Sequence, residues 1–187
     1  MGGLSAGMLE DLGLGLRGSA IVLLGAGGAA RAAAAECLRA GCAALWIMNR
    51  TRSNLDSLLA HLELVAGPVP VRALAPGGAG LRPGAIVINA TSAGLRAGDR
   101  PPADLSTLPG IAAVYDMIYN PPRTRLLAQA GELGLPNANG LGMLVHQGAK
   151  ALEIWTGVPA SRTAPAMRAA AAKALGYRGA ADSDSRR

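Results

Sequence analysis

Short, uninterrupted apolar runs recur along the chain, and stretches with helical spacing of apolar residues lie between them. The strongest runs are Ala20–Leu24, Ala44–Met48 and Ala85–Asn89. Runs of this kind are typical of strands that are buried on both faces of a parallel sheet. Further strands are predicted over Val69–Leu74 and Ala112–Met117 and, as a short one, near Asn137.

Helices are predicted before, between and after these strands. They cover Leu4–Leu12, an Ala-rich stretch ending near Arg39, a segment beginning near Ser53 with that hydroxyl as N-cap, Arg123–Leu133, Leu141–Thr156 and Ala160–Leu175. This alternation predicts an α/β fold, a Rossmann-like doubly wound, mostly parallel sheet with helices on both faces. Residues 1–177 are expected to form one domain, with loops over 76–84 and 97–110 and a polar, disordered tail over 178–187.

Length and composition fit that fold. A chain of 187 residues can bury one complete core but is too short for two ordinary domains. Half of the residues are hydrophobic while only 3% are aromatic and none is Phe, so Ala, Leu, Val and Ile must fill the core. Such small side chains suit helices packed closely on a sheet.

Charge and cysteine usage limit the classes of partner. The net charge is +6, but all except two of the 18 basic residues are Arg and they are scattered, so no nucleic-acid partner is expected. Cys37 and Cys42 have no metal-ligand spacing and are interpreted as small core hydrophobes in a reducing compartment. No signal peptide or membrane-length apolar run is found, which favours the cytoplasm.

A glycine-rich turn follows the first strong strand. GAGGAA, starting at Gly25, fits G-x-G-x-x-G/A and lies between a buried strand and a helix, where a dinucleotide's pyrophosphate would meet the helix N-terminus. The alternative is a turn that serves only helix–sheet packing. The predicted cofactor contacts here are Gly25, Ala26, Gly27, Gly28 and Ala29.

The end of the second strand indicates which dinucleotide would bind. An NAD site places a carboxylate there for the ribose 2′-hydroxyl, whereas this chain has Asn49, Arg50 and Thr51 and no carboxylate before Asp56. Guanidinium and hydroxyl groups suit a 2′-phosphate, so NADP is favoured. The alternative is a solvated Arg pair, formed by Arg50 and Arg52, at a strand end.

The third strong strand ends in a polar stretch. NATSAG begins at Asn89 and would lie at the carboxyl edge of the sheet, where open α/β folds bind ligands. We expect Asn89, Ala90, Thr91 and Ser92 to lie near the ribose on the nicotinamide side. Capping of turns by these polar side chains is the alternative.

Five blocks in this order resemble the NADP-binding domain of the shikimate dehydrogenase family: GAGGAAR, NRT, NATSAG, DMIYNPP, and NGLGMLVHQG with a following E-x-W-x-G. The resemblance implies NADP as cofactor and reversible reduction of 3-dehydroshikimate to shikimate. It implies substrate contacts at Tyr119 and Gln147. It also implies nicotinamide-side contacts at Met117, Gly140 and Met143.

The sequence departs from the family where a proton donor is needed. The family's catalytic Lys and its supporting Asp have no counterpart, since Leu4 falls where that Asp belongs, so no catalytic residue is assigned. Lys150 is interpreted as a solvated helix lysine, His146 as a surface or packing residue, and Asp116 as structural. We therefore expect an NADP-binding domain with little or no activity unless a substrate domain is supplied.

Several alternatives stay open at this point. A separate chain could supply the substrate domain, or the chain could be a non-catalytic NADP-binding or sensing module. Quinate or another cyclic polyol is an alternative substrate within the same superfamily. An uncovered apolar cleft wall would also allow a homodimer.

Overall fold

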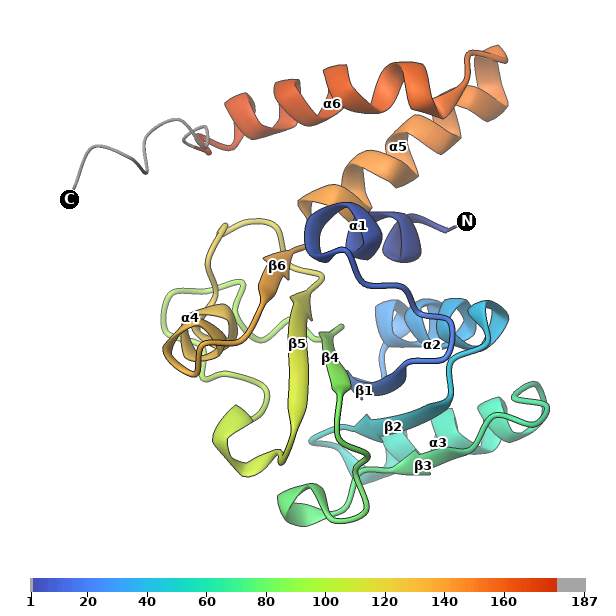
Figure 1. The fold of residues 1–187 in the computed structure, drawn as a ribbon, viewed down its shortest axis with the longest axis vertical. Helices are drawn as coiled ribbons and strands as arrows, with labels where there is room; N and C mark the ends of the chain where they lie inside the picture. The colour runs from blue at the N-terminus through green and yellow to red at the C-terminus, as the bar shows by residue number, and fades with distance from the viewer. Residues whose placement is uncertain (1, 178–187) are drawn as a thin grey trace.

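The computed structural model describes residues 2–177, so the predicted tail over 178–187 lies outside the described residues. Six strands form one parallel sheet in the order β3-β2-β1-β4-β5-β6 (Figure 1). The strands are β1 Ala20–Leu24, β2 Ala44–Met48, β3 Val71–Ala73, β4 Ala85–Asn89, β5 Ile111–Asp116 and β6 Asn137–Asn139. The chain reverses its direction of travel across the sheet between β1 and β4, which creates a switch point at their carboxyl ends.

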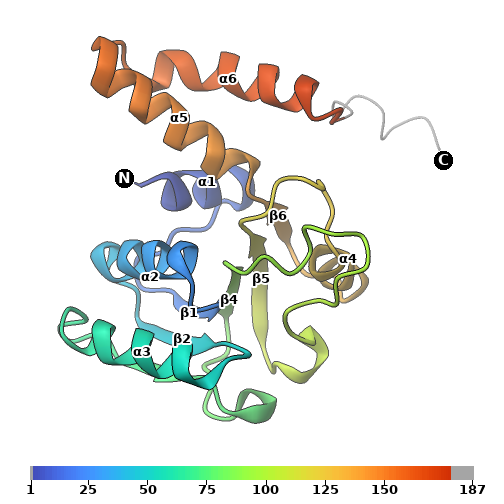
Figure 2. The same cartoon turned by 180° about the vertical axis from the view of Figure 1, so that it is seen from behind.

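Helices cover both faces of this sheet. They are α1 Gly3–Leu12, α2 Gly28–Ala40, α3 Arg52–Glu63, α4 Arg125–Glu132, α5 Leu141–Thr156 and α6 Ala160–Ala174, with short 3₁₀ helices η1 Pro76–Gly78 and η2 Leu105–Thr107. Figures 1 and 2 show α2 and α3 on one side of the sheet and α4 on the other. The predicted doubly wound, Rossmann-like fold is confirmed.

Alternate residues of β1 feed two separate cores. Ile21 and Leu23 pack with side chains of α1, α2 and α3, whereas Val22 and Leu24 pack with α4 and the segment around η2. Every residue of β1 is buried, which explains why the strand reads as an unbroken apolar run. Cys37 and Cys42 lie in the first core as free thiols, in agreement with the prediction.

Two local predictions need correction. The N-cap position of α3 is Thr51 rather than Ser53, and Thr51 caps without a side-chain hydrogen bond, so Ser53 lies in the first turn of the helix. The third strand is limited to Val71–Ala73 because it pairs only with β2, at the edge of the sheet. The cap of α4, by contrast, is a side chain: the Thr124 hydroxyl accepts a hydrogen bond from the Leu127 amide.

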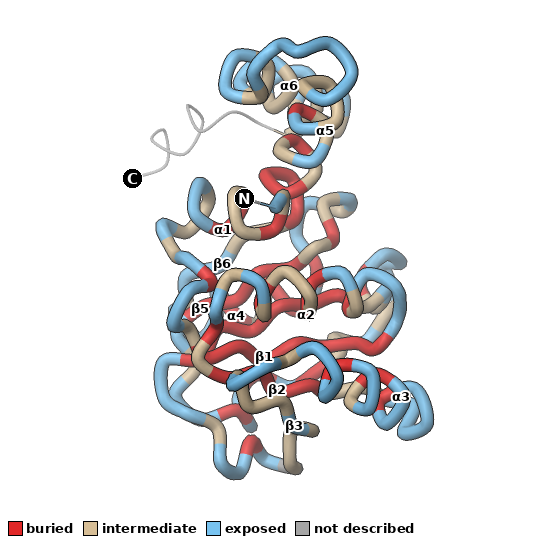
Figure 3. The backbone as a smooth tube through the Cα atoms, turned by 90° about the vertical axis from the view of Figure 1, so that its right-hand side faces the viewer, coloured by how far each residue is buried: buried red, intermediate tan, exposed pale blue. Residues whose placement is uncertain are grey.

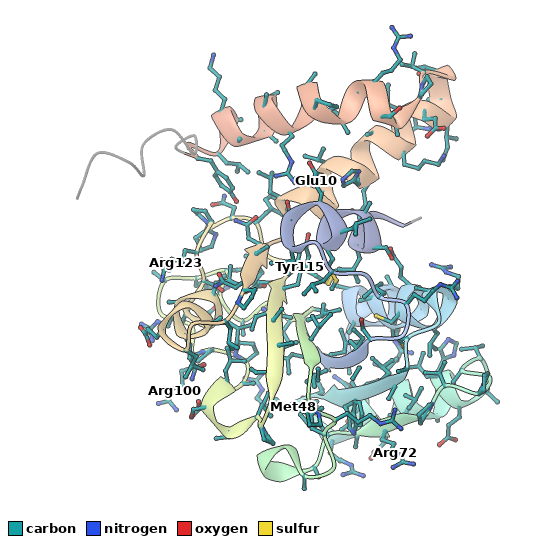
Figure 4. The ribbon with its side chains drawn as sticks, viewed as in Figure 1. Glu10, Met48, Arg72, Arg100, Tyr115 and Arg123 are labelled. Carbon is teal, nitrogen blue, oxygen red and sulfur yellow. The ribbon has the colours of Figure 1, made fainter. Side chains whose placement is uncertain are left out.

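Helices α5 and α6 form an antiparallel arm that extends beyond the sheet, and α6 contains no buried residue (Figure 3). Arg168 of α6 pairs with Glu10 and Asp11 of α1, while His146 of α5 meets Glu10 at 2.6 Å. Figure 4 shows Glu10 on the side of α1 that faces α5. The structure thus supports a packing role for His146.

The tip of the arm is apolar and exposed. Ile154 and Trp155, at the end of α5, are 72% and 80% exposed. No helix within residues 2–177 is long and apolar enough to cross a membrane.

Candidate functional site

A groove of about 1340 Å³ opens at the carboxyl ends of β1, β2 and β4. Figure 2 shows these strand ends from the side on which the loop after β4 runs across. The groove is lined by Leu24–Ala29, Met48–Thr51, Asn54, Ala90–Ala93, Leu95, Arg96 and Gly98–Pro102. Three of the predicted cofactor segments, widely separated in sequence, therefore meet in one cavity.

The glycine-rich turn forms one wall of this groove. Gly25 has φ +116°, and a Cβ there would lie 3.0 Å from the Ala90 carbonyl oxygen, so a side chain would meet both backbone strain and a close neighbour. Its amide donates to the Met48 carbonyl at 2.7 Å, which fixes the turn against β2. Gly27 is the N-cap of α2 with no side-chain cap, and nothing lies within 4 Å of a Cβ built on Gly27 or Gly28. The helix N-terminus therefore presents backbone N–H groups to open space, which suits an anion.

The end of β2 supplies a cation to the groove. Arg50 is exposed and lines the groove, and within residues 2–177 it makes no ion pair. Arg52 differs, because its guanidinium pairs with Asp56 at 2.9 Å on the surface of α3. Asn49 holds the turn by donating from Nδ2 to the Thr51 carbonyl at 2.8 Å. The structure thus separates the two arginines that the sequence had grouped together.

Asn89 supports the loop after β4 and is itself fully buried. Its Oδ1 accepts hydrogen bonds from the amide and the hydroxyl of Thr91, at 3.0 and 2.8 Å. Its Nδ2 donates to Asp116 at 2.8 Å. Asn89 therefore positions Ala90–Ser92, which line the groove, while its own side chain faces the protein interior.

Asp116 is the shared acceptor of a buried network. Its carboxylate accepts from Asn89 Nδ2, from the Ile118 amide at 3.0 Å and from Thr124 Oγ1 at 2.6 Å. Burial raises the pKa of the Asp116 carboxyl, although these three donors act in the other direction. The side chain joins the ends of β4 and β5 to the start of α4, in agreement with a structural role.

The residues predicted to lie near the nicotinamide cluster at the start of α5, outside the groove lining. The Gly140 amide donates to the Ile118 carbonyl at 3.1 Å, and a Cβ on Gly140 would collide with the Met117 carbonyl oxygen. Met143 is buried, and its amide donates to the hydroxyl of Tyr115 at 3.2 Å. Figure 4 places Tyr115 at the end of β5, beneath α1. Burial raises the pKa of the Tyr115 hydroxyl, so the hydroxyl stays protonated even though the hydrogen bond from Met143 acts in the other direction.

The two predicted substrate contacts lie on different elements. Tyr119 is half-buried in the segment after β5, and its carbonyl oxygen accepts a hydrogen bond from the Tyr177 hydroxyl. Gln147 is exposed on α5, against Gly3 of α1. Lys150, one turn further along α5, is exposed and pairs with Glu153 at 2.8 Å, as expected of a surface lysine.

Sequence reasoning missed one wall of the groove. Residues 97–110 are predicted only as loop and Arg96 has no predicted role, yet Arg96 and Arg100 line the groove. Asp99 shapes this loop, since its Oδ2 accepts from the amides of Gly94 and Arg96 at 3.0 and 3.1 Å, and these bonds lower the pKa of its carboxyl. The available signal was the presence of two arginines in the loop that follows β4, a strand that ends at the ligand-binding edge of the sheet.

The parallel sheet, its switch point and the glycine-rich turn define a Rossmann-type α/β domain. Residues 140–172 match the family model described as the shikimate 5′-dehydrogenase C-terminal domain. The NADP⁺-dependent shikimate dehydrogenase of Symbiobacterium thermophilum is 42% identical over 89% of the chain and 58% of that protein. The enzyme of the same name from Rhodospirillum rubrum is 44% identical over 80% of the chain and 53% of that protein. Over most of its length the chain is similar to these NADP⁺-dependent shikimate dehydrogenases, and it spans less than two thirds of the length of these curated relatives.

Solved structures show the same similarity. A shikimate dehydrogenase in complex with NADP⁺ superposes with a TM-score of 0.78 at 32% identity, covering 92% of the chain and 60% of that structure. Quinate dehydrogenase from Corynebacterium glutamicum in complex with NAD gives a TM-score of 0.74 at 28% identity, covering 91% of the chain and 60% of that structure. The fold is thus common to relatives whose names differ in substrate and cofactor.

Proposed function

We propose that this chain binds NADP in the groove and forms the cofactor-binding part of an oxidoreductase that interconverts 3-dehydroshikimate and shikimate. The observation that carries the proposal is the meeting of the glycine-rich turn, Arg50 and the loop after β4 in one cavity. The names of the curated relatives, NADP⁺-dependent shikimate dehydrogenases, support the choice of cofactor and substrate. The buried free thiols Cys37 and Cys42 fit a cytoplasmic location.

Each wall of the groove has a distinct role in this proposal. The N–H groups at the start of α2, reached past Gly27, bind the diphosphate. Arg50 and Thr51 bind the 2′-phosphate, because a guanidinium without a carboxylate partner can form charge-assisted bonds to it. The backbone of Ala90–Ser92, held by Asn89, contacts the ribose on the nicotinamide side.

The cluster at the start of α5 provides the substrate side. Met117, Gly140 and Met143 would contact the nicotinamide, and Tyr119 and Gln147 would contact the substrate. The exposed Gln147 amide supports this role, since among the described residues it has no hydrogen-bond partner that a substrate would need to displace.

The bound cofactor would supply the hydride that reduces a ketone. The reduction also requires a proton for the developing alkoxide. No Lys, His or Tyr is among the described residues that line the groove. Lys150 is engaged with Glu153, and His146 with Glu10. We therefore propose that this chain binds the cofactor but turns over little or no substrate by itself.

The first test is calorimetric titration with NADPH and NADH. Arg50→Asp should weaken NADPH binding by about 1–3 kcal/mol, the value of a charge-assisted hydrogen bond, and change NADH binding little. Arg82→Asp is the matched control. Arg82 lies just before the amino end of β4, whereas the groove lies at the carboxyl ends of the strands. Equal weakening of both cofactors by Arg50→Asp would refute the 2′-phosphate assignment, and failure of the wild-type chain to bind either would refute the proposed function.

The second test is turnover with NADP⁺ and shikimate, with quinate assayed in parallel. We expect cofactor binding without measurable product formation. Product formation would contradict the proposal that this chain lacks the proton donor. Lys150 and His146 would then be the first residues to substitute. A preference for quinate would contradict the proposed substrate while leaving the cofactor assignment intact.

A further inference from the structure

Three arginines face one groove. Arg50 comes from the end of β2, and Arg96 and Arg100 come from the loop after β4. Within residues 2–177 none of the three forms an ion pair. Asp99 is the one carboxylate among the described lining residues; its Oδ2 accepts hydrogen bonds from two amides of its own loop, and its single negative charge lies near Arg96 but cannot balance three arginines. The groove therefore has an excess of positive charge that the described part of the chain does not neutralise.

The loop that carries Arg96 and Arg100 has a braced backbone. The Leu95 amide donates to the Ser92 carbonyl at 3.2 Å, and the Asp99 amide donates to the Arg96 carbonyl at 3.0 Å. Gly94, at φ +119°, lies so close to Thr124 that an added Cβ would be 3.1 Å from its methyl group. The two guanidinium groups thus project from a fixed support, which lowers the entropic cost of binding an anion.

The order of the strands places Arg50 and the loop that carries Arg96 and Arg100 on different sides of the groove, and so near different phosphate groups of a bound dinucleotide. In the sequence β2-β1-β4, the glycine-rich turn follows the central strand, Arg50 follows β2, and the arginine loop follows β4. The turn and the start of the arginine loop touch, since a Cβ on Gly25 would lie 3.0 Å from the Ala90 carbonyl oxygen. The loop therefore lies on the diphosphate side of the groove, whereas Arg50 lies on the far side of the turn.

We infer that Arg96 and Arg100 bind the cofactor's diphosphate from the loop side, while the N–H groups of the turn bind it at the start of α2. This inference rests on the proposed function, because it assigns two further residues to the same cofactor site. A diphosphate held between backbone donors and guanidinium groups would have its charge matched on two sides. Recognition of the 2′-phosphate remains with Arg50.

The experiment separates the two phosphate groups by ligand. ADP-ribose contains the diphosphate and no 2′-phosphate, and adenosine 2′-monophosphate contains the 2′-phosphate and no diphosphate. Each is titrated, with NADPH, into the wild-type chain, the double variant Arg96→Gln/Arg100→Gln, the single variant Arg50→Gln and the control Arg82→Gln. Thermal unfolding of each variant checks that these exposed substitutions leave the fold intact.

The double variant should bind ADP-ribose and NADPH at least about tenfold more weakly and adenosine 2′-monophosphate unchanged. Arg50→Gln should show the reverse selectivity, losing adenosine 2′-monophosphate and NADPH but not ADP-ribose. Wild-type affinity of the double variant for ADP-ribose would overturn the inference while leaving the proposed function standing. Weakening of adenosine 2′-monophosphate instead would place the two arginines at the 2′-phosphate and also overturn it. A wild-type chain that binds none of the three ligands would refute both proposals.

Discussion

Replacing Asp116 by Ala should destabilise the fold severely, because one carboxylate satisfies three donors at a buried point. The donors are Asn89 Nδ2, the Ile118 amide and Thr124 Oγ1. Each buried donor left without an acceptor costs about 1–3 kcal/mol. The Asn89 amide keeps a longer contact of 3.5 Å to the Ala93 carbonyl, and the Thr124 hydroxyl can rotate. We therefore expect a loss of about 3–5 kcal/mol, a large part of the roughly 5–15 kcal/mol that holds a domain folded.

The matched control is Asp104→Ala. Asp104 also accepts three hydrogen bonds, from the amide and hydroxyl of Ser106 and from Gln129 Nε2, but it is exposed. Water can replace an acceptor at that position, so the control should lose much less stability than Asp116→Ala. The comparison isolates burial, because the number of hydrogen bonds is the same at both positions.

Urea denaturation followed by circular dichroism gives the free energy of unfolding for each variant. A double-mutant cycle with Thr124→Val should be non-additive by at least about 0.5 kcal/mol, because the two side chains share one bond. If Asp116→Ala costs no more than Asp104→Ala at an unchanged m-value, the network contributes nothing beyond surface hydrogen bonds and the reasoning is wrong.

Two further predictions concern pH and backbone packing. Because burial raises the pKa of Asp116 above its usual 3.8, folding favours the neutral carboxyl. Its contribution to stability is thus fully present below the unfolded pKa and is lost as pH rises through the folded pKa. Urea titrations across this range should show the wild type losing stability relative to Asp116→Asn as pH rises above 3.8, and parallel curves would contradict the shift. Gly140→Ala should cost about 1–3 kcal/mol through its clash with a carbonyl oxygen, whereas Gly15→Ala, which meets nothing within 4 Å, should leave stability unchanged or raise it by up to about 1 kcal/mol. Equal melting temperatures for these two glycine variants would refute the packing argument.

The strands could be predicted because burial on both faces is a local property of sequence. The bounds of β1, β2 and β4 follow directly from their apolar runs. The run over Val69–Leu74 was too long because its ends have no partner strand, and strand pairing is decided elsewhere in the chain. Ser53 has a suitable hydroxyl, but the helix begins one residue earlier, and a cap depends on backbone geometry that residue type alone does not give.

The candidate site also has parts that the local sequence predicts and parts that it does not. Motif spacing predicted the glycine-rich turn and Ala90–Ser92, since each directly follows a strand. The sequence alone did not distinguish Arg50 from Arg52. The structure distinguishes them, because Asp56 of α3 pairs with Arg52 and not with Arg50. Arg96 and Arg100 were missed because a loop rich in Gly and Pro has no periodicity from which side-chain directions can be inferred.

The chain's two tryptophans occupy opposite environments, and this makes the folded protein its own optical reporter. Trp46 is 7% exposed within β2, whereas Trp155 is 80% exposed at the tip of the arm formed by α5 and α6. Trp155 already emits as a hydrated indole in the native state, so the red shift on unfolding comes from Trp46 alone. A blue shift without unfolding would then mean that something has covered the end of α5.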